Sequence, residues 1–282
     1  ATMQDGILVE TLNSSREDKL IHIMNVSTEV ENTLISPRMT IKSHENSKIN
    51  VVEEFIDLSG ENLLVNAVTN IEIGQGATVE HHRISNCQSD SYHIGKVNCN
   101  VARDGNFTST SIALGGSISR IDIDIALNEP GACCTLNGLF IGEAEELIDH
   151  HTTIDHISSN TTSCEQYKGV MGGQSKGIFN GKVIVRENIS GVQASQNSDN
   201  ILLSQIAEIN TKPELQIYSD DVKCAHGATV GALDSDSIFY LRSRGLREND
   251  AKNLLIEAFV EETLVKIPAD SIKESIRTII RN

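Results

Sequence analysis

A cysteine and a histidine stand two residues apart in the segment YSDDVKCAHGATVGALD, residues 218–234. The composition around them is that of a β-strand, on which Cys224 and His226 would leave the same face with Cα atoms roughly 7 Å apart. A thiolate and an imidazole together suit iron, zinc or an iron–sulfur cluster. Two ligands do not complete a four-coordinate site, so a metal bound here needs further ligands from elsewhere.

Two other interpretations of the same pair stay open. A Cys–His nucleophile pair would need a third group to orient the histidine and an oxyanion hole, and the sequence identifies neither. Alternatively, Cys224 is a small buried residue and His226 is its polar neighbour. The spacing alone favours this structural interpretation.

A second polar segment, LIDHHTTIDHI, holds three histidines and two aspartates. On a strand, His150 and His156 share one face, while Asp149, His151 and Asp155 share the other. Such groups could bind a metal if a neighbouring strand completed the site, but we expect a solvated polar strand face. The same expectation applies to the two histidines of VEHHRI, His81 and His82.

The composition argues against several classes of protein. The 282 residues contain 23 Lys and Arg against 39 Asp and Glu, a formal charge of −16, which disfavours a nucleic-acid partner. No run of 18 apolar residues predicts a membrane span, and the N-terminal sequence has neither the basic leader nor the apolar stretch of a secretory signal. The motifs G-x-x-x-x-G-K-[ST], G-x-S-x-G and H-E-x-x-H are absent from the sequence, so we expect no nucleotide on this chain.

The cysteines lack the spacing of a disulfide scaffold or of a zinc finger. None of the six forms a C-x-x-C pair, and the chain is long for a disulfide-dense domain. We therefore expect reduced thiols in an intracellular compartment. Apart from the candidate site, they are expected to be small buried residues: Cys87, Cys99, Cys133, Cys134 and Cys164.

The sequence has two regions of different pattern, and the pattern of the first predicts an all-β structure. From about residue 5 to 232, segments such as ISRIDIDIAL and GKVIVREN alternate with period two between Gly, Asn, Asp and Ser turns. A turn, a glycine and an alternating strand recur at Gly76, Gly105, Gly131 and Gly177, at intervals of 29, 26 and 46 residues. The last interval is taken as two units. This drifting repeat favours a β-solenoid over a β-sandwich.

The second regime is helical. The segment DSDSIFYLRSRG offers Asp234 and Ser235 as N-cap candidates and ends at Gly245. A second helix would begin after an N-cap at Asn249 or Asp250, and a third follows Pro268 with its apolar face on Ile272, Ile276 and Ile279 or Ile280. We predict a β core over residues 1–233 and a helical domain over 234–282. These helices could cap the solenoid or dock a partner.

The candidate site lies inside a segment that resembles a known family. Residues 207–246, AEINTKPELQIYSDDVKCAHGATVGALDSDSIFYLRSRGL, resemble the signature of SufD, the scaffold subunit of the SUF iron–sulfur cluster assembly machinery, in the SufB/SufD family. Weaker resemblance covers GIFNGKVIV at 177–185 and NILLS at 200–204. The resemblance implies a right-handed parallel β-helix followed by a small helical domain. It also implies a helical region ahead of the β-helix, which this sequence does not include, so no function of that region is assigned.

The resemblance implies partners and a role for the site. Proteins of this kind pair with SufB through the β-helix, and a SufC ATPase docks on the C-terminal helices. The resulting complex builds a nascent iron–sulfur cluster on SufB for delivery to acceptors. His226 would supply a ligand at the SufB interface beside a SufB cysteine, with Cys224 as its neighbour. The partner chain would then provide the missing ligands.

The resemblance also implies a SufC-binding segment, FYLRSRGLRENDAKNLLIEAF. Its candidate contact residues are Phe239, Tyr240, Arg242, Arg244 and Gly245. The competing interpretation makes the aromatic residues and Leu241 helix core and leaves the arginines solvated. For Phe239 we expect core.

The resulting hypothesis is a non-enzymatic scaffold of iron–sulfur cluster assembly in the bacterial cytosol or plastid stroma. One alternative is a β-helical hydrolase acting on a polysaccharide, which needs a groove lined by paired carboxylates and aromatic residues. Aromatic residues are only 4% of this chain and tryptophan is absent, so sugar-stacking platforms are scarce. The other alternative is a self-pairing scaffold, since an exposed solenoid edge can pair with a second copy.

Overall fold

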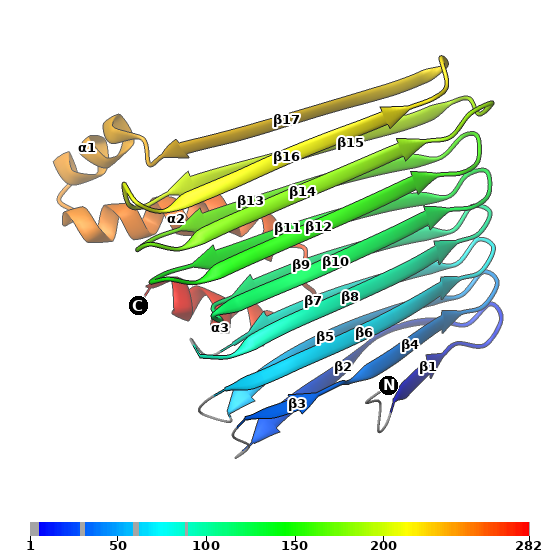
Figure 1. The fold of residues 1–282 in the computed structure, drawn as a ribbon, viewed down its shortest axis with the longest axis horizontal. Coiled ribbons are helices and arrows are strands. Elements are labelled where there is room, and N and C mark those ends of the chain that lie inside the picture. The colour runs from blue at the N-terminus through cyan, green and yellow to red at the C-terminus, as the bar shows by residue number, and fades with distance from the viewer. Residues whose placement is uncertain (1–5, 29–31, 59–61, 88–89, 282) are drawn as a thin grey trace.

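The chain folds as a parallel β-solenoid of about 7 turns followed by helices (Figure 1). The structure is a computed structural model that describes residues 6–28, 32–58, 62–87 and 90–281. The fold class predicted from the repeat and from the resemblance is confirmed. In the described part of the chain, no helix is long and apolar enough to cross a bilayer.

With one exception, where two consecutive strands share a sheet, successive strands alternate between two sheets. The sheets face each other across a filled interior, here called the lumen. All pairings within each sheet are parallel. Sheet 1 contains β1 Ile7–Glu10, β3 Thr33–Ile35, β4 Arg38–Ser43, β6 Leu63–Ile73, β8 Tyr92–Val101, β10 Ile118–Leu127, β12 Leu147–His156, β14 Lys176–Val185 and β16 Glu208–Ile217. Sheet 2 contains β2 Arg16–Thr28, β5 Lys48–Leu58, β7 Thr78–Asn86, β9 Asn106–Leu114, β11 Cys133–Gly142, β13 Thr162–Met171, β15 Val192–Leu202 and β17 Val222–Ala232.

The period-two alternation of the sequence divides each strand between the lumen and the outside. In β10, Ile121, Ile123 and Ile125 are buried in the lumen, whereas Asp122 and Asp124 are only partly buried on the outer face. Because strands of one sheet pair in register, residues of like polarity stack from turn to turn along the solenoid. A continuous apolar column is thus built from residues far apart in the sequence.

The turns from sheet 1 to sheet 2 set the length of each repeat. All of these turns except the last, between β16 and β17, contain a residue with positive φ, spaced 27 to 32 residues from the next. These residues are Ser14, Asn46, Gly76, Asp104, Gly131, Asn160 and Gly191. At Gly131 a Cβ atom would lie 2.0 Å from the Asp104 carboxyl oxygen of the turn below. The predicted repeat through Gly177 is wrong, because Gly177 lies inside β14. The units after Gly131 instead turn at Asn160 and Gly191.

The three helices are α1 Ser235–Ser243, α2 Glu248–Leu264 and α3 Asp270–Arg281. Asp234 caps α1, as predicted, with a carboxylate oxygen that accepts from the Ser237 amide at 2.9 Å. For α2 the predicted caps are wrong. Arg247 occupies the N-cap position and makes no side-chain cap bond, and its guanidinium pairs with Asp250 at 2.7 Å.

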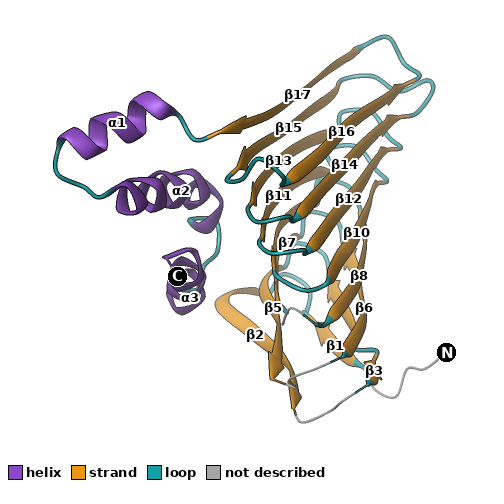
Figure 2. Cartoon of the chain, turned by 60° about the vertical axis from the view of Figure 1, so that its left-hand side comes forward, coloured by secondary structure: helices purple, strands orange, loops and turns teal. Residues whose placement is uncertain are grey.

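Helices α2 and α3 cover the outer face of sheet 2 (Figure 2). Their apolar residues pack against the outward side chains of the strands in one buried cluster, which includes Val52, Ile84, Ile112, Leu114, Leu139, Val170, Ile256, Val260, Leu264, Ile267, Ile272 and Ile276. Of the two alternatives left open by the sequence, α2 and α3 do not cap the end of the solenoid. They lie along its flank because sheet 2 presents apolar residues on both faces there. The domain boundary after residue 233 stays a prediction.

Candidate functional site

The C-terminal end of the solenoid presents two free strand edges. Among the described residues, β17 pairs only with β15 and β16 pairs only with β14 (Figure 1). The helices that follow β17 turn away to the flank, so they do not pair with either edge. An unpaired edge carries a row of backbone donors and acceptors that another strand can use.

Cys224 and His226 both lie on β17, at this end. Cys224 pairs in register with Ala194, and His226 pairs with Gln196. Cys224 is partly buried against the lumen cluster that contains Val183 and Val192. Because residues two apart share a face, His226 also belongs to the lumen side, yet it is exposed since no further turn covers it. The predicted pairing on one face is thus present.

Cys224 and His226 by themselves do not make a complete metal site. Burial raises the pKa of the Cys224 thiol, with a hydrogen bond to the Ala194 backbone acting weakly in the opposite direction. A thiol with a raised pKa keeps its proton at neutral pH until a metal or another cation displaces it. Within the described residues, no group of three or more His, Cys, Asp and Glu could hold a metal ion. The pair therefore fits one half of a Cys/His metal site.

A polar pair lies in the lumen behind His226, and the sequence reasoning missed it. Glu165 is 1% exposed, and its Oε2 accepts from Gln196 Nε2 at 2.6 Å. Glu165, Gln196 and His226 occupy neighbouring register positions on β13, β15 and β17. Burial raises the pKa of Glu165 to about 7, although the Thr152 hydroxyl and Gln196 act against this shift. Glu165, Gln196 and His226 are spaced 31 and 30 residues apart, which is close to one turn of the solenoid. This spacing is the sequence signal that could have identified the buried pair behind His226.

The histidine-rich segment divides between two environments. His150 and His156 are 1% and 0% exposed inside the lumen, and burial lowers their pKa values to about 3 and about 4. His81 and His82 are buried as well, the first in the lumen and the second on the outer face of sheet 2. The expectation of a solvated face is wrong for these four residues. They are enclosed because a solenoid buries the inward half of every strand and the helices cover sheet 2.

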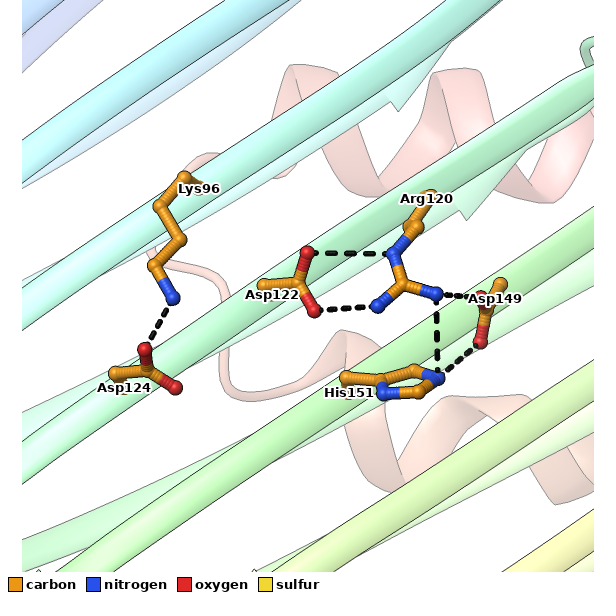
Figure 3. A network of polar contacts seen from close by, with 6 residues as sticks. All are labelled: Lys96, Arg120, Asp122, Asp124, Asp149 and His151. Atoms are coloured by element: carbon orange, nitrogen blue, oxygen red, sulfur yellow. Dashed lines mark hydrogen bonds and ion pairs between the residues drawn. The ribbon is translucent and has the colours of Figure 1, made fainter.

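The outward half of that segment is the polar face that was expected. On sheet 1 the Arg120 guanidinium bridges Asp122 and Asp149, and His151 Nε2 lies 2.8 Å from Asp149 Oδ1 (Figure 3). Lys96 pairs with Asp124 beside them (Figure 3). Asp124 and Asp149 pair with basic residues of neighbouring turns, and Asp122 pairs with Arg120 of its own strand. The network is therefore a stabilising surface array.

Helix α1 projects from the end of β17 and buries none of its residues. Phe239 is 74% exposed and Tyr240 is 55% exposed, so the expectation that Phe239 belongs to the core is wrong. Arg242 pairs with Glu248 at 3.3 Å, and the Arg244 guanidinium stands 5.2 Å from the centre of the Tyr240 ring. Gly245 ends the helix with φ of 101°. A hollow between α1 and α2 is lined by Tyr240, Leu241, Leu254, Leu255 and Ala258 together with polar residues of the α1 N-terminus.

The comparison with known protein families decides the classification. Residues 25–259 match the family model described as "SUF system FeS cluster assembly, SufBD core domain". The chain belongs to this family. The resemblance found in residues 207–246 is thereby confirmed, and the chain is a SufD-like member of the SUF iron–sulfur cluster assembly system.

Individual relatives agree with this classification. The chain is 31% identical to an iron–sulfur cluster assembly SufBD family protein of Synechocystis sp., over 99% of this chain and 64% of that protein. It is 30% identical to the iron–sulfur cluster assembly protein SufD of Escherichia coli, over 82% of this chain and 55% of that protein. A chloroplastic protein of Arabidopsis thaliana, ABCI7, is 27% identical over 87% and 52% of the two chains. The chain thus spans between 52% and 64% of the length of these relatives.

Proposed function

We propose that this chain is a non-enzymatic scaffold subunit that pairs with SufB through the open end of its solenoid and contributes His226 to a cluster-building site. The nascent iron–sulfur cluster is the cargo of that site. The observation that carries the proposal is the incomplete Cys224–His226 pair on a free strand edge. A metal needs further ligands, and a chain that pairs with β17 would bring them to the same place.

The two side chains have different roles in this proposal. His226 is exposed, and an imidazole ring nitrogen is a common metal ligand. Cys224 is partly buried, and the raised pKa of its thiol makes it the poorer ligand until a cation arrives. We therefore assign His226 as the first ligand and Cys224 as the second.

The test is anaerobic co-purification of the chain with SufB and SufC, followed by measurement of iron and sulfide. We expect His226→Ala to lower the iron and the sulfide content by about 10-fold or more. Removal of a residue that only supports a metal ligand already costs about that much, and removal of the ligand itself should cost at least as much. Cys224→Ser should give a smaller loss. Lys223→Ala, the adjacent outward residue on the same strand, is the matched control. Wild-type iron and sulfide in the His226→Ala complex would refute the site.

We propose further that SufC docks on α1 around Phe239, Tyr240, Arg242, Arg244 and Gly245. A largely exposed aromatic residue on a helix that buries none of its own residues is costly in water and typical of a binding hot spot. The hollow beside Tyr240 provides an apolar recess for a partner side chain. The ATPase activity would belong to SufC, since the sequence has no phosphate loop.

Replacement of Phe239 tests this docking surface. We expect Phe239→Ala to weaken SufC binding by about 10-fold or more, because truncating a hot-spot aromatic costs about 2 kcal/mol. Its melting temperature should stay close to that of the wild type, since the side chain is exposed. Tyr92→Ala, an exposed aromatic on sheet 1, is the control for both measurements. Unchanged SufC affinity of Phe239→Ala, measured by calorimetry, would exclude this surface.

The hydrolase alternative has weaker support. A hollow on the outer edge of sheet 1 includes Glu45, Glu72 and Glu129 in its lining, but no aromatic residue of the described chain lines it. It therefore lacks the stacking platforms that a polysaccharide site needs. For the compartment we propose bacterial cytosol or plastid stroma, which agrees with relatives from Escherichia coli and from a chloroplast.

A further inference from the structure

Only one end of the buried Gln196 amide makes a hydrogen bond among the described residues. Its Nε2 donates to Glu165 Oε2 at 2.6 Å, but its Oε1 is buried without a hydrogen-bond partner among the described residues. Gln196 as a whole is 3% exposed. An unpaired buried carbonyl oxygen costs about 1–3 kcal/mol, so such an atom calls for a donor.

The Gln196 side chain fills space that a glycine on the facing strand leaves open. A Cβ atom on Gly181 of β14, across the lumen, would lie 1.8 Å from Gln196 Nε2. The Gln196 amide therefore crosses the lumen and occupies the place of a missing side chain. In the observed orientation Nε2 donates to Glu165, and Oε1 is the amide atom left without a partner among the described residues.

The next residue in the same register column is His226. No hydrogen bond joins the two side chains as they are placed in the structure. Neighbouring strands are roughly 4.8 Å apart, so a rotation of the exposed His226 side chain toward the lumen would bring its imidazole to the Gln196 amide. A neutral imidazole has one N–H donor and one acceptor nitrogen, and the hydrogen bond made by one nitrogen decides which tautomer is present. The unpaired Gln196 oxygen accepts but does not donate, so it selects the tautomer that has N–H on the lumen side.

We propose that Gln196, held by Glu165, is a positioning residue for His226: its amide oxygen accepts one imidazole N–H and thereby leaves the other ring nitrogen as a free lone pair at the open end. This inference rests on the proposed role of His226 as a ligand. It assigns to the buried pair the outer-shell function that orients a metal-binding histidine. No residue of the pair touches the metal.

The first measurement needs only the isolated chain. Long-range ¹H–¹⁵N correlation spectra report the tautomer of His226, whose signals are identified by their loss in His226→Ala. We expect one dominant neutral tautomer in the wild type and a mixture of both in Gln196→Met, which keeps the side-chain length but has no acceptor oxygen. Gln193→Met, the same change on the outer face of β15, should leave the tautomer unchanged. Glu165→Gln retains an acceptor for Gln196 Nε2 and should retain the tautomer as well.

A second variant covers the case in which Gln196→Met does not fold. Gln196→Asn keeps the amide but is too short to span from Glu165 to His226, so it should also release the tautomer. If the folded variants show the wild-type tautomer, the inference is overturned. The second measurement is iron and sulfide in the complex with SufB and SufC, where we expect Gln196→Met to lose about 10-fold. A tautomer that responds while His226→Ala still assembles clusters would refute the ligand role and leave the positioning intact.

Discussion

Glu165 is a carboxyl group enclosed on all sides by the lumen. Its neighbours are the Gln196 amide, the Thr152 hydroxyl and the Tyr167 ring, and none of them carries a positive charge. Desolvation therefore raises the pKa of Glu165 to about 7. A carboxyl in this state is neutral at mildly acidic pH and acts as a hydrogen-bonding group.

The first prediction concerns stability against pH. The folded chain keeps the Glu165 proton up to about pH 7, whereas the unfolded chain loses it near the ordinary glutamate pKa of 4.5. The folded state thus binds more protons between these values, so the free energy of unfolding falls as pH rises from 4.5 to 7. Glu165→Gln lacks this proton, and its stability relative to the wild type should rise by about 3 kcal/mol over that window. Denaturant unfolding at a series of pH values measures the difference, and a difference that is constant with pH would contradict the prediction.

At the residue scale, the sequence predicts which side chains share a strand face, but not whether that face is buried or exposed. The Cys224–His226 face followed from strand alternation, since residues two apart must share a side. Alternation cannot tell which side is the lumen, so the sequence predicts solvent exposure for His81 and His150, which are buried. It predicts a core position for the aromatic Phe239, yet α1 touches too little of the chain to bury it.

At the scale of elements, one side chain anchors α2 to sheet 2. The Lys168 ammonium donates to the Phe259 carbonyl at 3.0 Å, pairs with Glu262 at 2.7 Å and lies 4.2 Å from the centre of the Phe259 ring. Lys168 sits among apolar residues on the outer face, and its stem packs there while the charged end reaches the helix. This contact joins the strand layer to the helices that carry the proposed SufC surface.

We predict that Lys168→Met loosens α2. The methionine preserves the apolar stem but removes the hydrogen bond and the ion pair, which should cost about 1–3 kcal/mol because a charged donor is lost. Hydrogen exchange at the α2 amides should rise, while exchange in β13 and β15 changes little. Lys182→Met, on the outer face of sheet 1, serves as the control. Equal exchange in α2 of the two variants would show that the contact does not hold the helix.

The elements themselves were predictable to different degrees. Strands and the α1 cap followed from alternation and from Asp234, both of which are local signals. The predicted repeat fails at Gly177, because Asn160 and not a glycine occupies the left-handed position of the turn after β12. The flank position of α2 and α3 depends on apolar residues of six strands that meet only in the fold, so no local pattern could show it.

At the scale of the whole molecule, helices α2 and α3 cover one flank of the solenoid, and the strands at its C-terminal end have unpaired edges. Of the two free strands there, β16 contains Pro213, which has no N–H to offer a partner. β17 is 11 residues long and contains no proline. β17 is therefore the better template for another strand, whether from SufB or from a second copy of this chain.

The last prediction follows from this open end. We expect the isolated chain to form a dimer through β17 and SufB to displace the second copy, since both would use one edge. Val230→Asp places a charge among the lumen-side residues of β17, where a pairing chain would bury it. It should weaken both associations by about 10-fold or more, because even 1.4 kcal/mol of desolvation has that effect. Leu12→Asp, at a more exposed apolar residue of the opposite end, should change neither. Sedimentation velocity with and without SufB gives the masses, and a dimer that survives Val230→Asp but is lost in Leu12→Asp would place the interface at the N-terminal end instead.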